Sequence, residues 1–327
     1  MLAEPFEVPP LRCSPPPLRP ISTYSIIARD GLTGQLGAAV QSHWFNVGSV
    51  VPWAQAGVGV VATQSLVEIS YGPLGLDLMR SGKAATHALA ALIAADPGSA
   101  LRQVAMIDAR GNVATHTGGK CIAEAVDKNG VASDGSVYSC QANLMRKATV
   151  TGAMAVAFGA HKGPFAERLV ASLRAAEDEG GDIRGRQSAA ILIVRGVSSG
   201  KVWEDRLVDL RVEDHMTPVD KLGRLVRLHA AYTHMSAGDA ALTRKDSDAA
   251  MREYAAAQQL APGNSEMLFW TAVSLANVGK MDEALPIFAR VFKDATGDWR
   301  ETLRRLPNSG LLPNDVTLME RLLSAGT

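Results

Sequence analysis

The first two thirds of the chain alternate apolar with small or polar positions in short runs, a pattern typical of strands with helices between them. From Thr23 to Gln64 the order is strand, turn, strand and a further apolar strand, which predicts an antiparallel meander. Apolar residues recur at helical spacing over 72–96, so two helices should cover one face of the sheet. Residues 102–118 predict a hairpin that extends this sheet.

Helical spacing returns over 149–160 and 163–179, and apolar strands follow over 188–195 and 206–212. The elements therefore run as strands, helices, strands, helices and strands. A parallel doubly wound sheet would alternate strand and helix singly. The observed order instead favours a layered α+β sandwich built on antiparallel strands.

The pattern changes after His215, where 218–232 forms one amphipathic helical stretch. Beyond it, small and aromatic residues fall at the offsets of a tetratricopeptide unit, and a second set follows one repeat of about 34 residues later. We expect four segments: a leader over 1–22, a sandwich domain over 23–215, a connecting helix over 216–237 and a small all-α repeat domain over 238–327. The residues at repeat offsets are Gly238, Ala250, Tyr254, Ala257, Pro262, Ala284 and Phe288.

Charge and composition exclude several classes of protein. Lys plus Arg and Asp plus Glu number 33 each, so no net field favours a nucleic acid or an anionic membrane surface as partner. The three cysteines and the histidines show no metal-ligand spacing, and the chain lacks the common nucleotide-binding loops, so we expect no metal and no cofactor. The proline-rich residues 1–22 are predicted to be a disordered leader and not a secretory signal. No run is long and apolar enough for a membrane span, which favours a cytoplasmic protein.

Five separated blocks resemble one family, the domain of unknown function 1028. They read TYSIIARD, GAAVQSHWFNVGSVVPWAQAGVGVVATQ, YGPLGLDLM, GGDIRGRQSAAILIV and DLRVEDH, and the resemblance extends from about Thr23 to about His229. It implies similarity to N-terminal-nucleophile hydrolases, which have a four-layer αββα fold. Family members with a C-terminal helical or repeat extension are also implied.

The resemblance assigns Thr23 as the nucleophile, whose own α-amine would accept the hydroxyl proton. That role needs a free amine, whereas Ser22 precedes Thr23 in the chain. Three explanations are open: self-cleavage between the two residues, trimming by a protease, or a translation start drawn too far upstream. The chain has no lysine between Thr23 and Lys83, which disfavours chemistry of the proteasome type.

Two further residues are candidates for catalysis beside Thr23. His43 could act as a base or bind a substrate, although a histidine next to an aromatic residue is more often structural. Asn143 could donate a hydrogen bond to an oxyanion, although asparagine at such a junction is more often a helix cap. Threonine itself is common in strands, so the pattern alone does not distinguish a nucleophile from an ordinary strand residue.

The candidate substrate-binding residues lie in two places. Gln41 and Ser42 end the second predicted strand, where they could orient the nucleophile or a small substrate. Asp182, Arg184 and Arg186 lie on a glycine-rich loop, and forked guanidinium groups suit a substrate carboxylate. The alternative is that Asp182 pairs with an arginine to brace the loop.

These observations predict an amidohydrolase, acting on a C–N bond of a small molecule other than a peptide bond, with Thr23 as nucleophile after removal of residues 1–22. A non-catalytic protein that binds a small metabolite is the alternative. Residues 238–327 could dock a protein or peptide partner. Alternatively they could serve as an intramolecular brace or as a surface for homo-oligomer formation.

Overall fold

The computed structural model describes residues 22–294 and 296–326, so the predicted leader lies outside the described residues except for Ser22. The chain divides between Gly223 and Arg224 into two compact units, which are described separately. The first unit carries all the strands of the described chain.

Six antiparallel strands form the larger sheet of the first unit, in the order β10-β9-β2-β1-β8-β7. Its central strands β1 and β2 are buried almost throughout, and apart from one tyrosine and one glutamine the runs TYSIIA and LGAAVQS consist of small, β-branched and aliphatic residues, which suit a sheet covered on both faces. The strands are β1 (Thr23–Arg29), β2 (Leu36–Ser42), β7 (Val126–Val131), β8 (Val137–Ala142), β9 (Ser188–Val194) and β10 (Arg206–Val212).

Four more antiparallel strands form a second sheet, in the order β3-β4-β5-β6. They are β3 (Pro52–Gln55), β4 (Gly59–Ser65), β5 (Arg102–Asp108) and β6 (Val113–Thr117). The prediction of one meander from Thr23 to Gln64 was therefore wrong, because the chain changes sheets between β2 and β3. The predicted hairpin over 102–118 is confirmed as β5 and β6.

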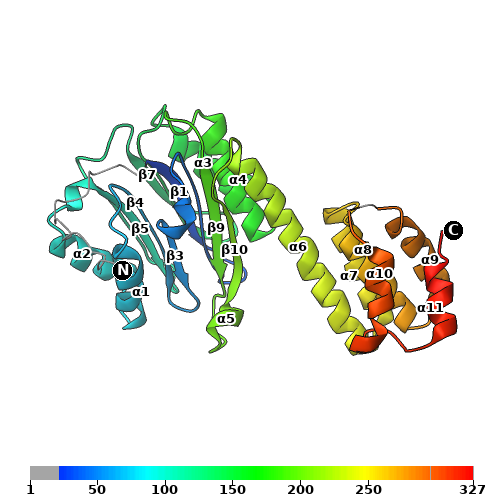
Figure 1. The fold of residues 1–327 in the computed structure, drawn as a ribbon. Helices are drawn as coiled ribbons and strands as arrows, with labels where there is room; N and C mark the ends of the chain where they lie inside the picture. The colour runs from blue at the N-terminus through cyan, green and yellow to red at the C-terminus, as the bar shows by residue number, and fades with distance from the viewer. Residues whose placement is uncertain (1–21, 295, 327) are drawn as a thin grey trace, which may run out of the picture. The chain divides into compact units, whose positions relative to one another are not determined.

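Helices lie on the outer faces of both sheets, and the inner faces contact each other (Figure 1). The four-stranded sheet carries α1 (Tyr71–Arg80) and α2 (Ala85–Ala95), whereas α3 (Val150–Ala160) and α4 (Phe165–Asp178) pack on the six-stranded sheet. The short helix α5 (Val202–Asp205) lies between β9 and β10. The first unit is thus mixed α and β with antiparallel sheets, as the sequence predicts.

The inner faces of the two sheets share an apolar core over most of their length. Ile27 and Val40 from one sheet pack with Val60, Ala105 and Ile107 from the other, and all five are at most 2% exposed. Towards the start of β1 this core becomes polar, because glutamine, serine and asparagine replace the aliphatic residues. That polar end contains the candidate site.

The described part of the second unit contains helices and connecting loops but no strands. It contains pairs of contacting helices, α7 with α8, α8 with α9 and α10 with α11. Gly238 allows a close approach, since a Cβ there would come within 2.4 Å of the Tyr254 ring. The helices are α6 (Pro218–Thr243), which begins in the first unit, α7 (Ser247–Leu260), α8 (Ser265–Asn277), α9 (Met281–Val291), α10 (Trp299–Arg305) and α11 (Val316–Leu323).

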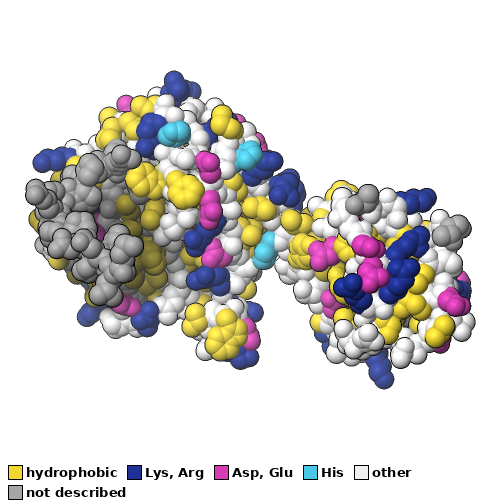
Figure 2. All heavy atoms as spheres, in the orientation of Figure 1, with side chains coloured by type: hydrophobic (Ala, Val, Ile, Leu, Met, Phe, Trp, Pro, Cys, Tyr) yellow, Lys and Arg dark blue, Asp and Glu magenta, His cyan; other side chains and the backbone are white. Residues whose placement is uncertain are grey.

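The surface carries mixed charge. On the face shown in Figure 2, Lys and Arg side chains are interspersed with Asp and Glu side chains, in keeping with their equal numbers in the sequence. Among the described helices none has the length and apolar character needed to cross a membrane.

Candidate functional site

The start of β1 is enclosed on every side. Thr23 is fully buried and pairs with Ser42 of β2 across the sheet. Its carbonyl oxygen accepts hydrogen bonds from the Asn143 backbone N–H at 3.1 Å and from Gln64 Nε2 at 3.3 Å. Residue 23 is therefore held by both sheets, since Gln64 belongs to β4 of the four-stranded sheet.

The carbonyl oxygen of Ser22 is held by two side-chain donors. Ser42 Oγ donates to it at 2.5 Å, and Arg184 Nη2 donates to it at 2.7 Å. One donor is a hydroxyl and the other is a full positive charge, so together they would stabilise negative charge developing on this oxygen. The carbonyl group that precedes Thr23 is thus bound by one neutral and one charged donor.

Asp182 fixes the position of Arg184. Its carboxylate accepts hydrogen bonds from Arg184 Nε at 3.1 Å and Nη2 at 2.7 Å, a bidentate geometry that arginine can form and lysine cannot. The Asp182 side chain is fully buried, and Arg184 remains 26% exposed. Asp182 and Arg184 thus form the ion pair that was expected if they brace the loop. The same guanidinium also donates to the Ser22 carbonyl oxygen.

Backbone hydrogen bonds join the loop of Asp182 and Arg184 to the loop that follows β8. The Arg146 N–H bonds to the Gly181 carbonyl at 3.0 Å, and the Ile183 N–H bonds to the Leu144 carbonyl at 3.3 Å. Leu144 has a φ of 57°, a conformation that costs a branched side chain about 1–2 kcal/mol. Backbone strain of this kind is concentrated at functional sites in proteins.

A chain of amide side chains crosses the space between the sheets beside Thr23. Ser25 Oγ donates to Gln64 Oε1 at 2.7 Å, and Gln64 Nε2 donates to Gln103 Oε1 at 2.7 Å. Asn143 Nδ2 donates to the same oxygen at 3.0 Å. All four side chains are at most 1% exposed, so this network fixes the alignment of the sheets at the start of β1.

The opposite face of the same strands carries different groups. Side chains alternate along a strand, so Tyr24 and its cross-strand partner Gln41 point away from Thr23 towards α4. Tyr24 Oη donates to Glu177 Oε1 at 3.0 Å. Burial raises the pKa of Tyr24 well above its ordinary value, and the Glu177 carboxylate raises it further. Burial also raises the pKa of Glu177, against the opposing effect of Arg186.

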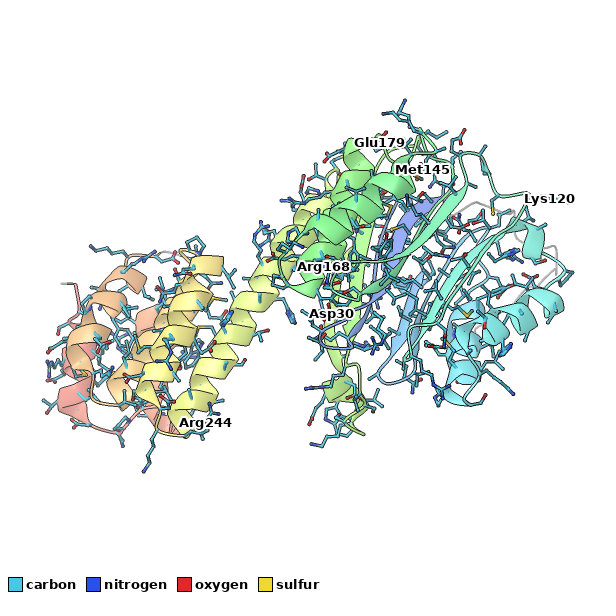
Figure 3. The ribbon with its side chains drawn as sticks, turned by 180° about the vertical axis from the view of Figure 1, so that it is seen from behind. Asp30, Lys120, Met145, Arg168, Glu179 and Arg244 are labelled. Atoms are coloured by element: carbon cyan, nitrogen blue, oxygen red, sulfur yellow. The ribbon has the colours of Figure 1, made fainter. Side chains whose placement is uncertain are left out.

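A pocket of about 270 Å³ opens beside Tyr24 on this face. Figure 3 shows Met145 and Glu179, the sequence neighbours of two lining residues, together at one end of the six-stranded sheet, away from Asp30 and Arg168. The lining residues are Tyr24, Gln41, Arg146, Glu177, Gly180, Gly181, Asp182, Ile183, Arg184, Gly185 and Arg186.

The predicted site residues thus lie in two groups. Thr23, Ser42 and Asn143 surround the start of β1, and Arg184 reaches it with Asp182 behind. The remaining candidates belong to the helix-facing side. Gln41 and Arg186 line the pocket there, and the exposed His43 bonds to the loop, its N–H to Asp182 at 3.4 Å and its Nδ1 to the Arg186 carbonyl at 3.3 Å.

Sequence reasoning missed several residues of this region. Gln64 and Gln103 lie in the apolar strands VVATQS and RQVAMID, where a glutamine at an inward position was the available signal. Arg146 and Glu177 gave no such signal, because each follows an ordinary helical or loop pattern. Within the described residues, no group of three or more His, Cys, Asp or Glu side chains could hold a metal ion.

Comparison with known proteins identifies the family. The family of unknown function DUF1028 matches residues 23–222, which is more than half of the chain, so the chain belongs to this family. A crystal structure of the DUF1028 protein SPO2555 from Silicibacter pomeroyi is similar, with a TM-score of 0.55 and 29% sequence identity. The match covers 63% of this chain and 88% of that one. No functionally curated protein is significantly similar to the chain.

Proposed function

We propose that this protein is an amidohydrolase of the N-terminal-nucleophile type, with Thr23 as the nucleophile once residues 1–22 are removed. Its substrate would be a small molecule with an amide-type C–N bond. The observation that carries the proposal is the pair of donors, Ser42 Oγ and Arg184 Nη2, on the carbonyl oxygen immediately before Thr23. In turnover such an enzyme carries the substrate acyl group as an ester on the hydroxyl oxygen of the nucleophile, and the same two donors would bind the carbonyl oxygen of that ester.

The fold supports the proposal at the level of architecture. Helices α1 and α2 pack on one of the two contacting sheets, and helices α3 and α4 pack on the other. These contacts support a four-layer αββα sandwich, the arrangement expected for this type of hydrolase. Many activities share one fold, so the argument for function depends on the residues around Thr23.

The same donors would serve removal of the leader. Thr23 Oγ would add to the Ser22 carbonyl carbon, and the oxygen that becomes negative is the one bound by Ser42 and Arg184. Cleavage of the C–N bond would leave an ester on the Thr23 hydroxyl and a free α-amine. Water would then hydrolyse the ester, releasing the leader with a carboxylate on Ser22 and restoring the hydroxyl.

After processing, the Thr23 amine would accept the hydroxyl proton, and the donor pair would bind the carbonyl oxygen of the substrate. Gln64 and Asn143 would hold the Thr23 backbone through its carbonyl oxygen. This assigns Asp182 a positioning role, because it touches Arg184 and not the reacting atoms.

The intact mass of the purified protein tests this function. We expect a chain that begins at Thr23 and has amidase activity on a panel of small amides. Thr23→Ala should remain uncut and inactive. Ser42→Ala should slow processing or turnover by roughly 100-fold, as loss of one oxyanion donor does in other hydrolases. Full activity from a chain that retains residues 1–22 would contradict the proposal.

A non-catalytic binding protein is the second candidate. The Thr23 nitrogen is in a peptide bond with Ser22 in this chain, and an acylated amine cannot act as a base. In that case the helical segment 238–327, whose residue spacing resembles tetratricopeptide repeats, would supply a docking surface for a protein partner. A leader retained in the cell, together with a metabolite that co-purifies with Thr23→Ala, would favour this candidate.

A further inference from the structure

The pocket beside Tyr24 is separated from Thr23 by the strands themselves. Ser25 contacts Gln64 of the other sheet, and Thr23 shares its face by strand alternation. Tyr24 contacts Glu177 of α4 on the opposite face. A molecule in this pocket would therefore lie behind the hydrogen-bonded pair β1 and β2 as seen from the Thr23 hydroxyl.

Gln41 is the most informative residue of this pocket. Its side chain is fully buried, yet neither the amide nitrogen nor the amide oxygen has a hydrogen-bond partner among the described residues. Leaving a buried polar group without a partner costs about 1–3 kcal/mol, and a carboxamide has both a donor and an acceptor to satisfy. A ligand with a complementary amide would satisfy both atoms at once.

The arginines that line the pocket outnumber the carboxylates by one. Asp182 is matched by Arg184 through two short contacts, and the Arg186 Nε lies 3.5 Å from the Glu177 carboxylate. The exposed Arg146 has no ion-pair partner among the described residues, and its side chain lies against Gly180, where a Cβ would come within 3.0 Å of its Cδ. One surplus guanidinium suits a ligand with a single carboxylate.

We propose that this pocket is a second small-molecule site, distinct from the Thr23 face, and that it binds a monocarboxylic acid bearing a primary amide. The amide pairs with Gln41, donor to acceptor and acceptor to donor, and the carboxylate pairs with Arg146. Its volume of about 270 Å³ accommodates a short linear molecule of this kind. The site shares Arg184 with the Ser22 carbonyl, so an occupant would contact the residue that holds that oxygen.

Calorimetric titration of the full chain tests the site with a homologous series of ω-amide acids: malonamate, succinamate, glutaramate and adipamate. The corresponding diamides lack the carboxylate, and simple fatty acids of equal length lack the amide. We expect at least one member of the series to bind roughly tenfold or more tightly than both of its partial analogues. Failure of every member to exceed them would overturn the proposal.

Variants locate the binding. Gln41→Leu and Arg146→Met should each weaken the best ligand by roughly tenfold or more, whereas Arg110→Met, at an exposed arginine outside this pocket, should not. Leucine should preserve or raise the melting temperature, because the amide that it replaces has no partner. Unchanged affinity in both pocket variants would refute the assignment.

Thr23→Ala separates this site from the proposed hydrolase. Affinity for the best ω-amide acid should survive this substitution, since the ligand lies on the other side of the strands. A loss of binding in Thr23→Ala would show that the ligand reaches the nucleophile and that the pocket is not a separate site. Because Thr23→Ala lacks the proposed nucleophile, it would not hydrolyse the ω-amide acids and its affinities report binding alone, so either proposal can fail without the other.

Discussion

Replacing Arg168 by methionine should destabilise the first unit by about 3–5 kcal/mol, the usual cost of removing one partner from a buried ion pair. Arg168 lies on α4 with its side chain 5% exposed, 3.2 Å from Asp30 and 2.7 Å from Asp134. Its guanidinium also donates to Ser136 Oγ at 3.1 Å and lies 4.3 Å from the centre of the Phe158 ring. Methionine keeps the apolar contacts but leaves the Asp30 carboxylate, 6% exposed, without its cation.

Native-state hydrogen exchange suits this measurement, because it reports on β1 and β2 separately from the second unit. A loss of about 3–5 kcal/mol predicts exchange of their slowest amides that is faster by roughly 100-fold to several thousand-fold. Arg174→Met on the same helix is the matched control. Its pair with Asp220, at 3.5 Å, is 44% and 65% exposed, so it should contribute at most about 1 kcal/mol. Equal exchange in the two variants would refute the reasoning.

Three other perturbations have definite outcomes. Because the pKa of Glu177 is raised by burial, the folded protein binds this proton more tightly than the unfolded chain does, and wild-type stability falls as pH rises from about 4 through the raised pKa. The stability of Glu177→Gln relative to wild type should therefore increase over this pH range in denaturation experiments, and a constant difference would contradict the reasoning. Gly72→Ala puts a Cβ 2.4 Å from the Trp53 ring, so chemical denaturation should show a free energy of unfolding lower by about 1–3 kcal/mol. Gly152 on α3 has open space around its Cβ position, so Gly152→Ala should raise the free energy of unfolding by a few tenths of a kcal/mol. Burial raises the pKa of Cys140 to about 12, so this thiol should react with a disulfide reagent only on unfolding, and rapid labelling of the native protein would exclude that.

Local sequence patterns predicted most of the elements but not their assembly. The helices over 72–96 and the hairpin over 102–118 depend on spacing within one segment, which the sequence shows directly. The division of the strands into two sheets depends on contacts between distant segments, such as the pairing of β1 with β8. Strand β7 was missed because VDKNGV, at the sheet edge, has no alternating apolar face.

Two of the candidate residues lie together in the structure beside Thr23. Ser42 and Arg184 were both candidates, and both contact the carbonyl oxygen that precedes Thr23. The sequence did not show which face of the sheet each candidate side chain occupies, because that depends on the strand register. Neighbouring residues of a strand point to opposite faces, so Ser42 lies on the Thr23 face and Gln41 on the helix-facing side.

The network of buried amide side chains beside Thr23 determines how the two sheets of the first unit are aligned. Gln103 belongs to the four-stranded sheet, yet its Nε2 donates to the carbonyl oxygens of Val126 and Ala142 in the other sheet, at 3.2 and 3.1 Å. Apolar surfaces tolerate sliding, whereas hydrogen bonds require particular distances and angles. Gln103 therefore sets the lateral offset of the two sheets together with Gln64, which bonds across them to Ser25 and to the Thr23 carbonyl. Aliphatic residues elsewhere in the interior can change with little effect on the position of the first strand, provided that these two glutamines stay.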